Sequence, residues 1–221
     1  MFSLLKKNTA FFLPYFLCLL AGGVILVLYP KTDIHLFINS HHSPLGDFFF
    51  SNWTTIGLGI TIIPVALILA FIRFRYMLIS VLGFLVTVII NDSLKPLFHA
   101  PRPITVFGQL HQSLYLVPNV EMYSWNSFPS GHTATGFCMF CLLALYIPNK
   151  LAKFTCFVAA LLIAYSRIYL SEHFLQDVYA ASIIGISCAL ITYYWGMNGR
   201  LFNKFADRLD KPLINFSKKT Q

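Results

Sequence analysis

The sequence predicts an all-α fold: a polytopic membrane protein built as a six-transmembrane-helix bundle. Hydrophobic residues make up 57% of the 221 positions and charged residues only 11%, about half the charged fraction of a typical soluble domain. The apolar residues gather in six runs, and polar clusters stand at the ends of these runs on one side. We expect a single domain over residues 1–221.

The six predicted spans follow one another in the chain. They are Ala10–Tyr29, Thr54–Ile72, Tyr76–Leu94, His132–Ile147, Phe154–Tyr169 and Val178–Met197. Several are shorter than the roughly 20 residues of a typical spanning helix, so their polar ends should lie at or below the membrane surface. The first run has no A-x-A cleavage site, and we therefore interpret it as an anchor and not as a signal peptide. Very short connections make spans two and three, and spans four and five, antiparallel hairpins.

The lysines and arginines predict the orientation of the bundle. If the N-terminus is inside, the twelve basic residues on the cytoplasmic side are Lys6, Lys7, Arg73, Arg75, Lys150, Lys153, Arg200, Lys204, Arg208, Lys211, Lys218 and Lys219. The four on the outer side are Lys31, Lys95, Arg102 and Arg167. Because positive residues collect in the cytoplasm, we expect both termini there, with 198–221 as a cytoplasmic tail. This bias also accounts for the net charge of +8 without a nucleic-acid partner.

Two outer stretches differ in character. Pro30–Trp53 contains the adjacent pair His41-His42 and should be a solvated loop, because neighbouring side chains point in different directions. Ala100–Phe128 is longer and rich in aromatic residues. Amphipathic aromatics suit a membrane interface, where this stretch either anchors the protein or meets a lipid headgroup.

The fourth run begins with a polar segment that suits an anion. Pro129 and Ser130 are favourable residues at a helix start, where unpaired amide donors and a partial positive charge attract phosphate. Gly131 lets an anion approach the backbone, and His132 can exchange a proton near neutral pH. An ordinary helix cap is the alternative interpretation of this segment alone.

Two further polar clusters lie at the outer ends of the spans. The segment K-x6-R-P starts at Lys95 and includes Arg102, and S-R-x5-H-x3-D starts at Ser166 and includes Arg167, His173 and Asp177. A basic residue at membrane depth costs about 2.5–3.5 kcal/mol on insertion scales, and a bound anion would offset that cost. If the last segment is helical, the carboxylate four residues after the histidine lies on the same face.

Together, these two segments and P-S-G-H resemble the three-part signature of the type 2 phosphatidic acid phosphatase family, the integral-membrane lipid phosphate phosphatases. The resemblance implies an active site at the outer membrane interface, within residues 95–177, that needs no metal or cofactor. It implies three catalytic residues: His173 as nucleophile, His132 as proton donor and acceptor, and Asp177 as the partner that orients the nucleophile. It implies five phosphate ligands: Lys95, Arg102, Ser130, Gly131 and Arg167. Asp92 and Glu172, nearby in sequence, have no predicted role.

The predicted function is hydrolysis of a phosphate monoester or pyrophosphate on an outer-leaflet lipid of a bacterial inner membrane, through a phosphohistidine. Undecaprenyl pyrophosphate, phosphatidylglycerol phosphate, phosphatidic acid and lipid A phosphates are all candidate substrates, and the oligomeric state stays open. A sugar-phosphate phosphatase of the same family is one alternative. A non-catalytic lipid transporter or anion channel is another, although such a protein has no need for the two histidines and their carboxylate.

Overall fold

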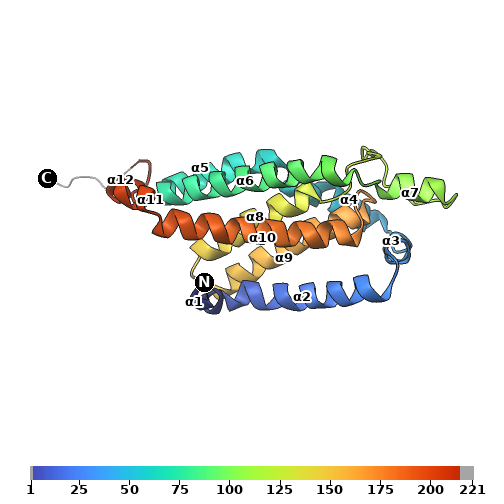
Figure 1. Cartoon of the computed structure of the whole chain (residues 1–221), viewed down its shortest axis with the longest axis horizontal. Helices are drawn as coiled ribbons and strands as arrows, with labels where there is room; N and C mark the ends of the chain where they lie inside the picture. The colour runs from blue at the N-terminus through green and yellow to red at the C-terminus, as the bar shows by residue number, and fades with distance from the viewer. Residues whose placement is uncertain (1, 215–221) are drawn as a thin grey trace.

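The computed structural model describes residues 2–214, and within that range every regular element is a helix (Figure 1). The predicted all-α class is therefore confirmed. The five longest helices are α2 (Thr9–Leu28), α6 (Phe74–Phe98), α8 (Gly131–Tyr146), α9 (Lys150–Tyr169) and α10 (Leu175–Asn198). In Figure 1, α2, α6 and α10 follow the long axis of the molecule, and α8 and α9 are inclined to it. The part of the predicted tail at 215–221, with Lys218 and Lys219, lies outside the described residues.

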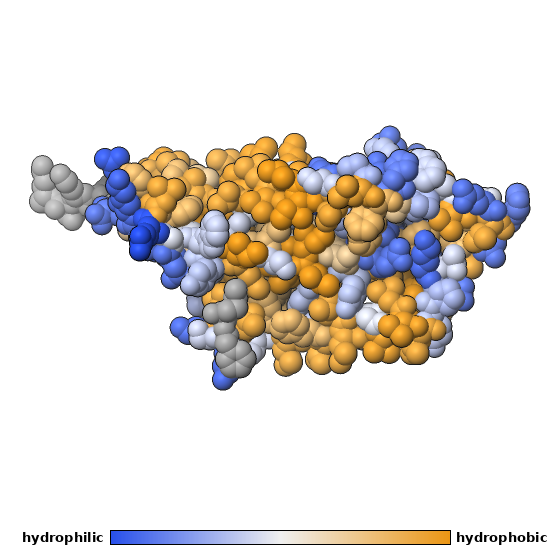
Figure 2. All heavy atoms as spheres, viewed as in Figure 1, coloured by the Kyte–Doolittle hydropathy of each residue, from blue (hydrophilic) through white to orange (hydrophobic). Residues whose placement is uncertain are grey.

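Four segments of the described chain are long and apolar enough to cross a membrane, those of α2, α6, α9 and α10. A bent helix pair would be a fifth, and α8 is a shorter apolar helix of 16 residues. Figure 2 shows apolar residues over the middle of one face and polar residues gathered toward its two ends. The molecule is thus a multi-pass membrane protein, while the exact count of six spans stays a prediction.

The second predicted span is not one straight helix. Two 3₁₀ turns, Thr54–Gly57 and Gly59–Thr61, separate α4 (Pro44–Trp53) from α5 (Ile62–Ile72), and the pair is bent by 62°. Gly57 sits at this break because a Cβ there would lie 2.9 Å from the Ile163 side chain and 3.1 Å from the backbone oxygen of His132. The close approach requires glycine, and hydropathy alone does not reveal such a constraint.

The predicted solvated loop over Pro30–Trp53 is wrong, because most of it folds into α3 (Lys31–Asn39) and α4. Ser43 caps α4 by accepting a hydrogen bond from the Gly46 amide, and Pro44 is the first residue of the helix. Serine followed by proline is a typical helix start. The sequence therefore contained a signal for α4. We predicted a loop because this stretch has no long apolar run.

The core is centred on α8, which packs against α6, α9 and α10. Ten of its 16 residues are buried. Gly185 of α10 lies so close that a Cβ there would stand 2.3 Å from the Ala134 oxygen of α8. The helix α8 is therefore largely enclosed by its neighbours.

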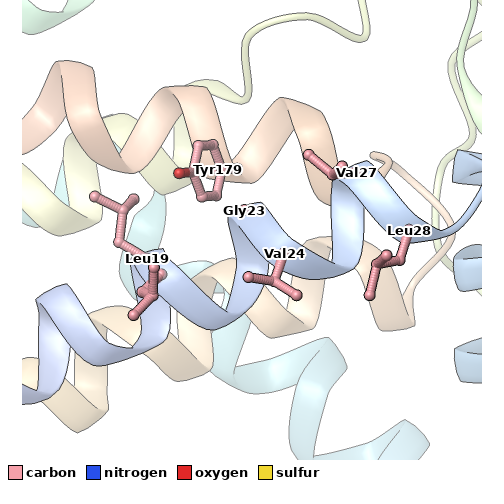
Figure 3. Close-up of a pocket in the computed structure, with 7 residues that line it drawn as sticks. Leu19, Gly23, Val24, Val27, Leu28 and Tyr179 are labelled. Atoms are coloured by element: carbon pink, nitrogen blue, oxygen red, sulfur yellow. The ribbon is translucent and has the colours of Figure 1, made fainter.

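The two ends of the bundle differ. The helices near the termini, α1 (Phe2–Lys7), α11 (Arg200–Lys204) and α12 (Ala206–Leu209), lie toward one end, and α3 and α7 (Pro103–Gln109) lie at the other (Figure 1). Asp210 forms ion pairs with Arg73 at 2.9 Å and Arg75 at 2.6 Å, so the segment after α12 is fastened to the start of α6. An apolar groove of about 410 Å³ lies between α2 and α10 near Tyr179 (Figure 3), and among the described residues none of the predicted site residues lines it.

Candidate active site

The three polar clusters meet at the end of the bundle where α6 finishes and α8 and α10 begin. The Ser130 amide donates to the Asp177 carbonyl at 3.3 Å, which joins the start of α8 to the start of α10. A Cβ added to Gly131 would lie 3.7 Å from Nζ of Lys95 and 3.6 Å from Nδ2 of Asn91. The fold therefore brings together segments that lie far apart in the sequence.

His173 lies in the connection between α9 and α10 and is 2% exposed. Its Nδ1 is 2.6 Å from the Ser127 carbonyl oxygen and 3.6 Å from Oδ2 of Asp177. A carbonyl only accepts, so Nδ1 carries the proton and Nε2 carries the free lone pair. Nδ1–H of His173 thus donates to the Ser127 carbonyl and not, as we had expected, to the Asp177 carboxylate. His173 precedes the helix, and its ring does not share a helical face with the carboxylate.

Asp177 is fully buried and has a different set of partners. Its Oδ2 accepts from the Ser127 hydroxyl at 2.5 Å and from the Phe174 amide at 2.9 Å. Asp177 is the third residue of α10, where a carboxylate commonly caps the helix start. Its contact with the histidine runs largely through Ser127, whose backbone holds the ring and whose hydroxyl holds the carboxylate.

Arg102 and Arg167 converge on one carboxylate. Oε2 of Glu172 forms an ion pair with Nη1 of Arg102 and lies 3.4 Å from Nη2 of Arg167. Each guanidinium has a second anchor: Nε of Arg102 donates to the Trp125 carbonyl at 3.0 Å, and Nη1 of Arg167 donates to the Thr54 hydroxyl at 2.6 Å. The two cations are therefore fixed in place, side by side.

Burial shifts the pKa values of His173 and Glu172 in the connection between α9 and α10. It lowers the pKa of His173 to about 4, and the nearby positive charges of Arg167 and Arg102 act in the same direction against the opposing effect of Asp177. Burial also raises the pKa of Glu172, although Arg167 and Arg102 counteract the rise. His173 is consequently a neutral imidazole at physiological pH.

The start of α8 supplies the remaining predicted residues. Ser130 occupies the N-cap position, but its side chain does not cap the helix; it accepts from the Thr133 hydroxyl at 3.0 Å. His132 and Gly131 line a cavity of about 150 Å³ together with residues of α6 and of the bent pair. Lys95 pairs with Asp92 at 2.8 Å and remains partly exposed.

The residues that sequence reasoning missed all contact the predicted ones through non-local packing. They are Ser127, Thr54, Trp125 and Glu172. Glu172 alone carried a signal, as an acidic residue beside the predicted nucleophile. Within residues 2–214, no group of three or more His, Cys, Asp or Glu side chains is arranged to hold a metal ion. The positive charge at the site comes from Lys95, Arg102 and Arg167.

The structure is thus a helical bundle with a buried histidine and an arginine pair at one end. The chain belongs to the PAP2 superfamily, whose family model matches residues 76–200, more than half of the sequence. The family that the three motifs predicted is thereby confirmed.

Named relatives agree with this class. The chain is 26% identical over 185 residues to the lipid A 4'-phosphatase of Bacteroides thetaiotaomicron, covering 80% of this chain and 77% of the relative. The crystal structure of Aquifex aeolicus LpxE superposes with a TM-score of 0.67 at 30% identity, over 73% of this chain and 93% of that one.

A PAP2-type phosphatidylglycerolphosphate phosphatase from Bacillus subtilis shares the fold, with a TM-score of 0.65 at 23% identity over 89% of this chain and 98% of that one. The chain spans only 34% and 46% of the length of two other curated relatives that it matches.

Proposed function

We propose that the protein removes a phosphate group from a membrane lipid through a phosphohistidine formed on His173, at the outer face of a bacterial inner membrane. One observation carries the proposal: the Ser127 carbonyl, 2.6 Å from Nδ1, leaves Nε2 of a buried neutral imidazole with a free lone pair. Nucleophilic attack on phosphorus requires that lone pair. The neighbouring arginine pair supports the same conclusion, because phosphate oxygens are its natural ligands.

In the proposed first step, Nε2 of His173 forms a bond to phosphorus while the bond from phosphorus to the lipid oxygen breaks. Charge spreads over the three equatorial phosphoryl oxygens, where Arg102, Arg167 and Lys95 stabilise it. The amides at the start of α8, together with the Ser130 hydroxyl, add neutral donors. The lipid oxygen leaves with its electron pair and takes a proton; we assign the donor role to His132, whose protonated form the negative charge of a bound phosphate would favour.

In the second step, the now neutral His132 takes a proton from water, and the hydroxide attacks phosphorus. The bond from phosphorus to Nε2 breaks, inorganic phosphate departs, and both histidines return to their starting states. Asp177 supports the cycle by bracing Ser127 through the 2.5 Å hydrogen bond. No step in this scheme requires a metal ion, since side-chain cations supply the positive charge.

For the substrate, we propose a phosphorylated lipid A-type glycolipid first and a phosphatidylglycerolphosphate-type lipid second. The first choice rests on the lipid A 4'-phosphatase relative, which covers 80% of this chain. The second rests on the shared fold of the Bacillus subtilis enzyme, which at 23% identity is weaker support. The exposed aromatic residues Tyr115, Tyr123 and Trp125 suit contact with the lipid headgroup.

The test is phosphate release by the purified protein in detergent from lipid A, phosphatidylglycerolphosphate, undecaprenyl pyrophosphate and glucose 6-phosphate. We expect release from at least one lipid and much less from the sugar phosphate. His173→Ala should lose at least about 1000-fold in kcat, because it removes an interaction made during bond formation. Release by a folded His173→Ala protein at more than a tenth of the normal rate would contradict the nucleophile assignment. The absence of release from every lipid would favour the transporter or channel.

A further inference from the structure

Glu172 is a buried acidic residue within the arginine pair and has no part in the steps above. It directly precedes His173, and its side chain is 3% exposed. One of its oxygens, Oε2, contacts both Nη1 of Arg102 and Nη2 of Arg167. These are the guanidinium groups that the proposed reaction assigns to phosphate.

A carboxylate and a phosphate compete for the same donors. Each presents pairs of acceptor oxygens that bind guanidinium N–H groups two at a time. An oxygen that already lies between two guanidiniums therefore occupies part of the surface that a phosphoryl group would use. For phosphate to bind both arginines fully, this carboxylate must give up or share its contacts.

The two arginines have other anchors besides Glu172. Arg102 keeps its hydrogen bond to the Trp125 carbonyl, and its guanidinium lies 5.2 Å from the Tyr123 ring centre. Arg167 keeps its hydrogen bond to the Thr54 hydroxyl. Each cation thus keeps a hydrogen bond that does not involve this carboxylate, so Glu172 is not their sole anchor.

We propose that Glu172 is an internal competitor for the arginine pair and sets how weakly the site holds inorganic phosphate. The inference rests on the proposed function. Glu172 neutralises one of three neighbouring cations while the site is empty, and it favours departure of the phosphate product after turnover. Substitution by the uncharged, isosteric glutamine should therefore tighten phosphate binding.

The experiment measures binding of inorganic phosphate to the full-length protein in detergent, from the rise of the thermal unfolding midpoint with phosphate concentration. We expect the Kd of Glu172→Gln to be lower than that of the wild type by a factor on the order of ten, equivalent to about 1.4 kcal/mol. Where phosphate release limits turnover, kcat falls as well. Glu121→Gln is the matched control, because Glu121 is an exposed acidic residue nearby, hydrogen-bonded to Tyr123; its Kd should stay within about twofold.

An unchanged or higher Kd in folded Glu172→Gln overturns the proposal, as does an equal tightening in Glu121→Gln or the absence of phosphate binding in both the wild type and Glu172→Gln. If Glu172→Gln does not fold, Glu172→Asp replaces it. Its shorter side chain withdraws the carboxylate from both guanidiniums, so its Kd should lie below that of the wild type, and an equal or higher value overturns the proposal. Binding is measured without turnover, so a protein that binds phosphate but releases none from lipids contradicts the proposed function alone.

Discussion

At the scale of single residues, the position of one proton decides what His173 can do. Ser127 supplies the acceptor for Nδ1, and Asp177 holds Ser127. We had expected the Asp177 carboxylate alone to orient the His173 ring. Instead, the Ser127 carbonyl accepts the hydrogen bond from the ring, and the Ser127 hydroxyl donates to the carboxylate. A backbone carbonyl cannot titrate, so the tautomer that it selects persists over a wide pH range.

The low pKa of His173 predicts a pH-dependent stability. The folded protein holds this histidine with a pKa of about 4, whereas an unfolded histidine titrates near 6.5. Below pH 6.5 the unfolded chain therefore binds more protons, and the contribution of the neutral ring to stability declines as the pH falls from about 6.5 to about 4. Above pH 6.5 the contribution is complete.

The measurement is the thermal unfolding midpoint of the wild type and of His173→Gln between pH 7.5 and pH 4.5. We expect the wild type to lose more stability on acidification than the variant, because only the wild type carries this titrating group. Parallel curves for the two proteins would contradict the assignment of a lowered pKa to His173.

At the scale of helices, the site depends on how closely α8 and α10 approach each other. Gly185 permits this approach, since a Cβ there would stand 2.3 Å from the Ala134 oxygen and 3.0 Å from the Cys138 amide nitrogen. Both contacts are to backbone atoms, which cannot rotate away as side chains do. The same α8 begins with Gly131 and His132, so its placement and the site geometry are coupled.

Gly185→Ala should destabilise the protein by about 1–3 kcal/mol and reduce phosphate release, because it pushes α8 away from α10. The matched control is Gly108→Ala in α7, where a Cβ would meet nothing within 4 Å, and a change of less than about 0.5 kcal/mol is expected. Midpoints of thermal unfolding and initial rates measure both effects. Equal behaviour of the two variants would show that the close packing at Gly185 has no influence on the site.

At the scale of the whole molecule, the helices near the termini and the polar site lie toward opposite ends of the bundle (Figure 1). The distribution of basic residues along the chain predicts that the terminal end faces the cytoplasm. A site at the outer end would receive a lipid phosphate at headgroup level. Extraction of the acyl chains, at about 0.8 kcal/mol per buried methylene, would then be unnecessary.

This orientation predicts which engineered cysteines are accessible in intact cells. Gln112→Cys, on the exposed loop after α7, should react with a membrane-impermeant thiol reagent, and Asp207→Cys in α12 should react only after the cells are lysed. Both positions are exposed, and the unmodified protein, with four buried cysteines and Cys18 within α2, is the control. The opposite labelling pattern would place the site at the cytoplasmic leaflet.

The helical membrane class, the approximate limits of α2, α6, α8, α9 and α10, and the family could all be predicted from the amino-acid sequence. Hydropathy runs and motif spacing are local properties, and the bilayer forces long apolar segments into helices. Hydropathy was less informative for the short helices α3 and α4, which lie where we had predicted a loop.

The contacts between individual atoms of the site could not be predicted in this way, because they depend on the packing of the helices. The acceptor for His173 comes from a residue 46 positions away, and Arg167 meets a hydroxyl 113 positions away. Glu172 was visible beside the predicted nucleophile, yet its role between two guanidiniums depends on where Arg102 lies, 70 positions earlier. Such contacts follow from how the helices pack, because packing fixes the distance between side chains that the sequence places far apart.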